Sequence, residues 1–548
     1  MRRRVGLRSS RIIPVVLLLV TLGFSFSAHG QSFGTCGAPA PEDFSAARLL
    51  KAPQILQMKI SDNNRIFYIT KSGQVHCYDI ETGDHWQIGE FAVSDSGYMG
   101  LLSLALHPDF PDTPWIYFLY SSKPEPGLST YTDFIVWRYP WNGSAIDMSL
   151  GKKIIAIPNR NVGQPPAGTH TGGKLTFGHG GLLFITSGDN SRFDSYGQLD
   201  DRTEEGTALY TSGNTNSLQG KILRIKPIPF YDWETPDPGP GKTYEIPSGN
   251  LFPPGMEKTR PEIYAMGIRN GYSIHVDEPT GWIMVGDVGP QGSKHNERGP
   301  AGGEELMLMT GPGNHGWPMF FGENKPYARY DYTSKVAGKK YDPQKPVNDS
   351  QWNTGIRELP LPLGATYTYY KNEDDPLGVG FTGPSGTSIA GPIYRFDHRA
   401  ASPHRLPVQL DGKWLIADNV QQKTGYLVPA EDGSKVVEGG PLFRNLGLGT
   451  VIDLQLGPDG VLYSLDYGNG IARVSYNGDQ KTPEECGIPM GCMNPDFLEY
   501  DPEARWDDGS CETSWEKYSA LWDRVPFSGL SVARRKPLSP AANSPVKM

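Results

Sequence analysis

Residues 170–189 read HTGGKLTFGHGGLLFITSGD, a histidine and two glycines that lead into alternating strand residues and end on an acid. A histidine on the loop before a strand can present its ring to a central cleft, and a carboxylate at the far end of the strand can orient it. An ordinary turn would explain the histidine alone, since most histidines are structural. The functional interpretation therefore depends on the sequence around this stretch.

The stretch is one of six with the same organisation, in which two apolar runs flank a turn of Asp, Asn, Pro or Gly. The other five begin at Met58, Leu104, Ile274, Val408 and Leu454. Period-2 alternation across such turns is typical of β-hairpins, and its recurrence indicates a propeller whose blades carry insertions. The sequence thus predicts an all-β fold, a six-bladed β-propeller, with long loops after Asp189 and Asp287 that build one functional face.

The composition agrees with this fold. The 548 residues include 66 Gly, 48 Pro and 11% aromatic residues, a balance rich in turns and strands. Propellers grow by radial repetition, so one large domain over residues 31–480 is favoured over several independent ones. The net charge of −9 gives no electrostatic footprint for nucleic acid, which we exclude as a partner.

The two ends of the chain differ from the middle. Residues 1–30 combine several arginines with the apolar run IIPVVLLLVTLGFSF and small residues before Gln31, which predicts a secretory signal peptide. An uncleaved anchor is the alternative, although the run is short for a membrane span. We expect a secreted or periplasmic mature chain without a stable membrane span, and a disordered tail at residues 525–548, which are rich in Pro, Ser and basic residues.

Export makes the five cysteines disulfide candidates before they are metal ligands. Cys36 precedes the first hairpin and Cys486 follows the last, so a bridge between them would staple the closed ring. Residues 486–515 resemble the short acidic cysteine modules of extracellular proteins, and the resemblance implies that Cys492 and Cys511 pair; a turn-rich loop is favoured there over a calcium site. Cys77 is then the odd one, and we expect it to be buried as a small hydrophobe.

Further motifs occur in a fixed order along the chain. They are GLLSLALHPDF from Gly100, LQGKILRIKP from Leu218, PEIYAMGIRN from Pro261, GDVGP from Gly286, GEEL from Gly303 and GNHGWP from Gly313. Together with residues 170–189 they resemble the glucose/sorbosone dehydrogenase family over about residues 49–476. The resemblance implies a six-bladed propeller that binds pyrroloquinoline quinone and calcium and oxidises a sugar (aldose) or related alcohol by hydride transfer to the quinone.

The resemblance also implies roles for individual residues. His170 matches the general base that takes the hydroxyl proton, and Asp189 matches the acid that orients it. Arg269 and Asn270 match the pair that holds the quinone oxygens and stabilises the charge arriving with hydride. Lys423 matches a lysine that contacts the cofactor.

Calcium and the quinone carboxylates raise a separate expectation. Gly289 and Pro290 match residues whose backbone carbonyls bind the cofactor calcium, an ion that prefers oxygen ligands. Better-known relatives carry two cofactor-binding arginines where this chain has Thr450 and Ile452, and they carry Gln and Asp where it has Met99 and Thr169. Quinone binding should therefore be unusually dependent on calcium.

Two other classes of function stay open. One is a non-catalytic propeller that binds a glycan or protein ligand, as in the hedgehog-interacting proteins that resemble this family. The other is a calcium-dependent lactonase-like hydrolase, which should show Glu, Asn and Asp ligands on the propeller axis. The sequence has no CxxCH haem motif, so a dehydrogenase would pass its electrons to an external acceptor.

Overall fold

The computed structural model describes most of the chain between Cys36 and Glu512. Within that span it leaves out residues 96, 122–132, 159–168, 192–207, 229–242, 332–333, 398–399, 401, 493, 495–496, 502–503, 505 and 508. The expected signal peptide at residues 1–30 and the expected disordered tail at residues 525–548 lie outside the described residues. In the described part of the chain, no helix has the length and apolar character needed to cross a membrane.

The described strands form six principal sheets, each of which is one blade of a propeller. Blades 1 and 2 contain β2 (Ile55–Ile60), β3 (Arg65–Thr70), β4 (Gln74–Asp79), β5 (His85–Glu90), β6 (Leu101–Leu106), β7 (Trp115–Ser121), β8 (Phe134–Pro140) and β9 (Lys152–Ile157). Blade 3 contains β10 (Gly172–Gly178), β11 (Leu182–Ser187), β12 (Lys221–Pro227), β13 (Tyr244–Glu245), β14 (Ile263–Met266) and β18 (Gly313–Asn314).

The remaining blades follow in chain order. Blade 4 contains β15 (Gly271–Asp277), β16 (Trp282–Asp287), β17 (Gly303–Met309) and β23 (Tyr367–Tyr370). Blade 5 contains β24 (Ser388–Ile393), β25 (Trp414–Asp418), β26 (Lys423–Pro429) and β27 (Val436–Pro441). Blade 6 contains β28 (Val451–Leu456), β29 (Leu462–Asp466), β30 (Gly470–Tyr476) and β1 (Phe44–Leu50).

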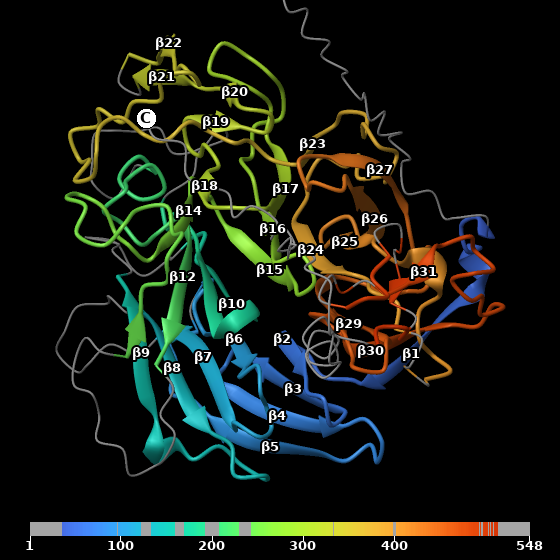
Figure 1. Ribbon diagram of the computed structural model, residues 1–548. Coiled ribbons are helices and arrows are strands. Elements are labelled where there is room, and N and C mark those ends of the chain that lie inside the picture. The colour runs from blue at the N-terminus through green and yellow to red at the C-terminus, as the bar shows by residue number, and fades with distance from the viewer. Residues whose placement is uncertain are drawn as a thin grey trace, which may run out of the picture.

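The first strand of each blade lies at the propeller axis. These strands pack against one another in a closed ring, in the order β2, β6, β10, β15, β24, β28 and back to β2. Figure 1 shows the blades arranged around this axis, with β1 in blue beside β30 in red. The ring confirms the predicted all-β, six-bladed propeller. The N-terminal strand β1 pairs with β30 and so completes the last blade, which closes the ring.

The predicted hairpins correspond to the first two strands of the blades, with one exception. Residues 408–410 of the fifth predicted hairpin form a short 3-10 turn instead of a strand. The strand Trp414–Asp418 pairs instead with Ser388–Ile393, which lies earlier in the chain. Pro407 precedes the turn and cannot donate to a strand ladder, which is consistent with this difference.

Two disulfides have the expected pairing. Cys36 is bonded to Cys486 across a sequence separation of 450 residues, and Cys492 is bonded to Cys511 across 19. The first joins the segment before β1 to the segment after β30, so it closes the ring covalently where β1 closes it by pairing. Cys77 in β4 is a buried free thiol, as expected.

Small paired strands decorate the propeller between β17 and β23. They are β19 (Phe320–Phe321) with β20 (Lys325–Pro326) and β21 (Ala328–Asp331) with β22 (Val336–Lys340), and near the C-terminal end β31 (Met490–Gly491) pairs with β32 (Trp506–Asp507).

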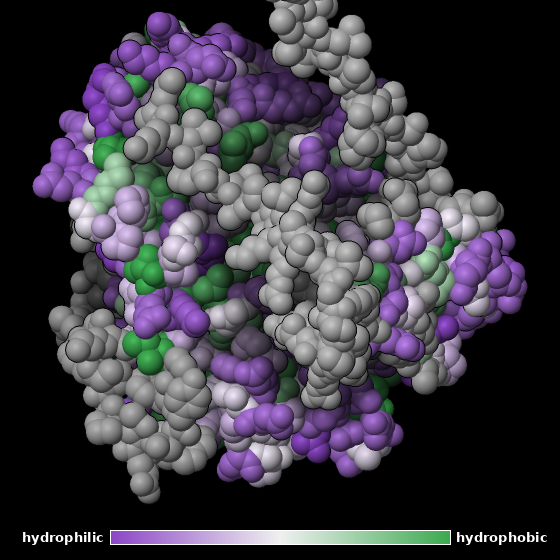
Figure 2. All heavy atoms as spheres, viewed as in Figure 1, coloured by the Kyte–Doolittle hydropathy of each residue, from purple (hydrophilic) through white to green (hydrophobic). Residues whose placement is uncertain are grey.

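Hydrophobic cores lie between adjoining blades, where alternate residues of facing sheets interdigitate. On the face in Figure 2, hydrophilic side chains predominate at the periphery.

Candidate functional site

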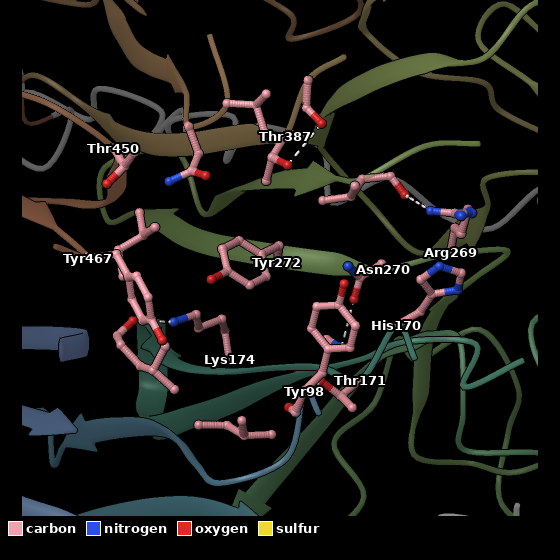
Figure 3. Close-up of a pocket in the computed structure, with 18 of the residues that line it drawn as sticks. Tyr98, His170, Thr171, Lys174, Arg269, Asn270, Tyr272, Thr387, Thr450 and Tyr467 are labelled. Carbon is pink, nitrogen blue, oxygen red and sulfur yellow. Dashed lines mark hydrogen bonds between the residues drawn. The ribbon is translucent and has the colours of Figure 1, made fainter. Parts of the chain in front are cut away.

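A cavity of about 930 Å³ lies at the end of the propeller where the first strands begin. Residues of all six blades line it, so it lies on the axis. Figure 3 shows His170 and Arg269 at one end of the cavity and Lys174, Tyr467 and Thr450 at the other, with Tyr272 between them. A cavity of this size suits a small-molecule ligand.

Bulges in the first strands build the floor of this cavity. In five of the six blades, the pairing of the first strand with the second shifts register within its first residues. The bulged residues that line the cavity are Leu56, Leu102, Lys174, Tyr272 and Ile452. A bulge re-aims a side chain out of the regular alternation, and in each of these five blades it directs one side chain toward the cavity.

His170 and Asp189 meet in this structure. The predicted hairpin, formed by β10 and β11, lies between them, and its antiparallel pairing returns Asp189 to the level of His170, so the acid is not at the far end from the histidine. His170 Nδ1 lies 2.8 Å from Asp189 Oδ1. The two loops pack so closely that a Cβ on Gly188 would lie 1.8 Å from the His170 carbonyl oxygen, so glycine is required there.

The environment of this pair favours a neutral imidazole. The side chain of His170 is 11% exposed and that of Asp189 is fully buried. Burial lowers the pKa of His170, the nearby Arg269 guanidinium lowers it further, and Asp189 opposes both effects. A neutral ring that donates from Nδ1 to Asp189 carries its lone pair on Nε2, the atom that can accept a proton.

Trp317 fixes the other side of the acid. Its Nε1–H donates to Asp189 Oδ2 over 2.9 Å, and the Ser191 backbone N–H donates to Oδ1 over 3.1 Å. The Arg269 guanidinium lies over the same indole, 5.6 Å from the ring. Trp317 therefore contacts both the acid and the cation of the site.

Arg269 and Asn270 are held by a buried carboxylate at the end of β16. Asp287 accepts from both backbone N–H groups, at 2.9 Å from Arg269 and 2.5 Å from Asn270. Asn270 Oδ1 accepts from the Gly172 N–H over 2.9 Å, and Arg269 Nη1 donates to the Val288 carbonyl over 2.7 Å. The Asn270 side chain is thus bonded to the loop that follows His170, and the Arg269 side chain is bonded to the residue that follows β16.

Gly289 and Pro290 follow β16 and Val288 in the chain but are not among the residues that line the cavity. Glu304 Oε2 accepts from the Gly289 N–H over 3.2 Å. The other carboxylate oxygen of Glu304 is buried without a hydrogen-bond partner among the described residues. Backbone carbonyls and a carboxylate oxygen are the kinds of oxygen donor that calcium prefers.

Other residues predicted from the resemblance lie elsewhere. Lys423 does not line the cavity: it begins the third strand of blade 5, away from the axis, where its exposed amine donates to the Gly380 carbonyl. Thr450 and Ile452 do line the cavity. Met99 is fully buried, and Thr169 Oγ1 donates to the Ser191 carbonyl over 2.5 Å.

Sequence reasoning missed several lining residues. They include three tyrosines, Tyr98, Tyr272 and Tyr467, together with Lys71 and Lys174. Tyr272 and Lys174 each follow a glycine close to the start of a first strand, which is a signal for a bulge. Trp317 had no comparable local signal, because its contact with Asp189 joins distant parts of the chain.

Comparison with known proteins agrees with this geometry. The Glucose / Sorbosone dehydrogenase family model matches residues 50–359, more than half of the chain. Quinoprotein glucose dehydrogenase B of Acinetobacter calcoaceticus is 26% identical over 312 residues, which cover 53% of this chain and 57% of that protein. Aldose sugar dehydrogenase YliI of Escherichia coli (strain K12) is 26% identical over 427 residues, which cover 74% of this chain and 85% of that protein.

A solved structure shows the same fold. The crystal structure of the soluble aldose sugar dehydrogenase of Escherichia coli, in its apo-form, matches with a TM-score of 0.53 at 20% identity. The match covers 79% of this chain and 99% of that one.

The chain spans little more than half the length of the Acinetobacter relative, although it spans most of the Escherichia coli one. With its propeller, its axial cavity and the matched residues 50–359, the chain belongs to the glucose/sorbosone dehydrogenase family.

Proposed function

We propose that the protein is a quinoprotein dehydrogenase that oxidises an aldose or a related alcohol, with pyrroloquinoline quinone and calcium as cofactors. The observation that carries this proposal is the contact between His170 Nδ1 and Asp189 Oδ1 at 2.8 Å, beside Arg269, in one axial cavity. A base, an acid that orients it and a cation at a single site supply what alcohol oxidation requires of a protein. Bound quinone would supply the hydride acceptor.

His170 acts as the general base in this proposal. As the substrate carbon loses hydride, its hydroxyl proton passes to Nε2 of the neutral imidazole. Asp189 holds the ring in the tautomer that leaves Nε2 able to accept, and it stabilises the imidazolium that forms. The lowered pKa of His170 keeps the ring unprotonated at neutral pH, so the base is ready without prior deprotonation.

Arg269 and Asn270 orient the acceptor. A guanidinium held over Trp317 and anchored on the Val288 carbonyl is preorganised for negative charge that develops nearby. The chemistry of the other lining residues fits the quinone, because Tyr98, Tyr272 and Tyr467 offer aromatic surfaces to a flat, anionic aromatic ring system. Gly289 and Pro290 would supply carbonyl ligands to calcium, beside the free Glu304 oxygen.

An extracytoplasmic location completes the proposal. The two disulfides favour an oxidising compartment, as does the predicted signal peptide. Reduced cofactor would pass its electrons to a separate acceptor, which an external dye can replace in an assay.

Reconstitution tests the proposed function. Purified protein is mixed with pyrroloquinoline quinone and calcium, and quinone absorbance on the protein and dye reduction are recorded across a panel of aldoses and simple alcohols. We expect bound quinone and dye reduction with at least one aldose. Absence of quinone binding in the presence of calcium would leave the non-catalytic binding propeller as the better interpretation.

A further inference from the structure

Lys174 is the only cation among the five bulged residues that line the cavity floor. The others are Leu56, Leu102, Tyr272 and Ile452, which are apolar or aromatic. Lys174 lines the cavity and is only 4% exposed, so little of its side chain is in contact with solvent. Burial of a single ammonium in such a floor is costly unless an anion meets it.

Protein partners satisfy this ammonium only in part. Lys174 Nζ donates to the Leu56 carbonyl over 2.7 Å and lies 5.5 Å from the Tyr272 ring. In the described part of the chain, no carboxylate forms an ion pair with it. Asp453, whose charge acts on Lys174, accepts from the Met58 N–H and from Gln455 Nε2. The amine therefore keeps hydrogen-bonding capacity for a ligand.

The position of the amine is opposite the reacting end of the cavity. Figure 3 shows Lys174 extending toward Tyr467, below Thr450, whereas His170 and Arg269 lie at the other end. Thr450 and Ile452 stand where the family resemblance places two cofactor-binding arginines, and neither side chain carries charge. The cavity's other lysine, Lys71, is half-buried and donates to the Gly97 carbonyl over 2.6 Å.

We propose that the Lys174 ammonium binds a carboxylate of the quinone cofactor at the end of the cavity opposite His170, in place of the two missing arginines. This inference rests on the proposed function, because it takes pyrroloquinoline quinone as the ligand. A cation on the first strand of blade 3 replaces cations on blade 6, so the charge reaches the same end of the cavity from a different blade.

The surroundings of Lys174 give the inference a pH signature. Burial lowers the pKa of Lys174 to about 8, Asp453 on β28 opposes this effect, and Lys59 on β2 adds to it. His275 and Tyr272 face the same region from β15, and burial keeps both uncharged at neutral pH. Lys174 is thus charged below about pH 8, and its attraction for a carboxylate is lost as the pH rises through that value.

Binding measurements on three variants test the inference. Quinone affinity is measured by fluorescence quenching, with saturating calcium, for the unaltered protein and for Lys174→Met, Lys174→Arg and Lys413→Met. Lys413 is a matched control, since it is 2% exposed and its amine lies 5.1 Å from the Tyr426 ring, outside the cavity. We expect Lys174→Met to weaken binding at least tenfold, Lys174→Arg to stay within about threefold, and Lys413→Met to match the unaltered protein.

A second arm covers the case in which Lys174→Met does not fold. The trimethyl ester of the quinone lacks the carboxylates, so its affinity for the unaltered protein should be lower and should not change between pH 7 and pH 9. The free tricarboxylate should bind the unaltered protein less tightly as the pH rises over that interval. Because burial raises the pKa of Glu304 to about 8, its ionisation also acts on the carboxylates in this interval. Lys174→Arg, whose guanidinium stays charged, is therefore measured in parallel and should lose less affinity than the unaltered protein.

The outcomes separate the inference from the proposed function. The role of Lys174 is overturned if Lys174→Met binds the tricarboxylate as tightly as the unaltered protein does. It is also overturned if tricarboxylate binding does not change with pH and does not differ from binding of the ester. Either result leaves the dehydrogenase proposal standing. Failure of the unaltered protein to bind the quinone with calcium present overturns both.

Discussion

Trp317 donates its indole Nε1–H to Asp189 Oδ2 over 2.9 Å, and this bond joins residues separated by 128 positions in the chain. The same indole lies 5.6 Å below the Arg269 guanidinium. One aromatic side chain thus supports both the acid that orients His170 and the cation of the cavity. Its contacts make Trp317 a positioning residue for the proposed reaction.

Replacement of Trp317 by Phe should reduce turnover without abolishing it. The variant leaves Asp189 Oδ2 without the indole donor, and hydrogen bonds to charged groups contribute about 1.5–3 kcal/mol, so we expect kcat to fall about tenfold to a hundredfold with little change in KM. Steady-state kinetics of the reconstituted protein measure both constants. Trp137→Phe is the control, since Trp137 Nε1 is buried without a hydrogen-bond partner among the described residues. Equal kcat values for the two variants would contradict the positioning role.

Removal of the base should affect turnover far more than cofactor binding. We expect His170→Ala to lower kcat by about 10²–10⁴-fold, the usual contribution of a general base, while quinone affinity changes little. Rapid-mixing kinetics of dye reduction and a parallel binding titration measure the two effects. Retention of full turnover with quinone bound would remove His170 from the mechanism.

The activity should also depend on pH in a defined direction. Burial and Arg269 lower the pKa of His170, so the base is neutral at pH 7 and becomes protonated only on acidification below its ordinary value. Activity is therefore fully present at neutral pH and is lost as the pH falls through the lowered pKa. A pH profile of kcat/KM with its acidic limb below pH 6.5 is the expected result, and an acidic limb above that value would count against this assignment.

The local pattern of the sequence was sufficient to predict the propeller. Period-2 alternation and turn residues are properties of neighbouring positions, so the hairpins at Met58, Leu104, Leu175, Ile274 and Leu454 were predicted from the chain itself. The hairpin at Val408 was wrong because an apolar run before a turn also describes a buried 3-10 turn. The pairing of Cys36 with Cys486 followed from the closure of the ring, whereas the pairing of Cys492 with Cys511 was predicted from a resemblance to short cysteine modules.

The site was less predictable, since it depends on contacts between blades. The order of the motifs indicated four site residues, and the structure brings them together at one end of the cavity. They are His170, Asp189, Arg269 and Asn270. Lys423 was predicted from the family resemblance. It begins the third strand of its blade, and each further strand of a blade lies farther from the axis, so its side chain does not reach the cavity. The bulge that turns Lys174 into the cavity is a departure from regular pairing, which alternation alone cannot reveal.

The ring-closing disulfide should stabilise the propeller more than the other one. Replacement of Cys36 and Cys486 by Ser removes a link across 450 residues that also fastens β1 to the last blade, and we expect a loss of about 2–5 kcal/mol in the free energy of unfolding. The matched control is the Cys492→Ser, Cys511→Ser variant, whose link spans 19 residues outside the blades. Denaturant unfolding followed by tryptophan fluorescence compares the two, and an equal or smaller loss for the ring-closing pair would contradict the staple.

Calcium removal should abolish quinone binding. The proposed ligands at Gly289 and Pro290 are carbonyls that cannot neutralise the quinone carboxylates, and the nearby Glu304 carboxylate would repel them once it is ionised. Without the ion, Arg269 and Lys174 are the buried cations that remain at the cavity, too few for a multiply charged anion in a partly dry site. Calorimetry should therefore detect no quinone binding in excess chelator and full recovery of binding after calcium is restored. With calcium present, Arg269→Ala should weaken quinone binding at least tenfold, about 1.4 kcal/mol. Magnesium serves as the control ion, because it demands a tighter octahedral geometry and should not replace calcium. Undiminished binding in chelator would show that protein groups alone hold the quinone.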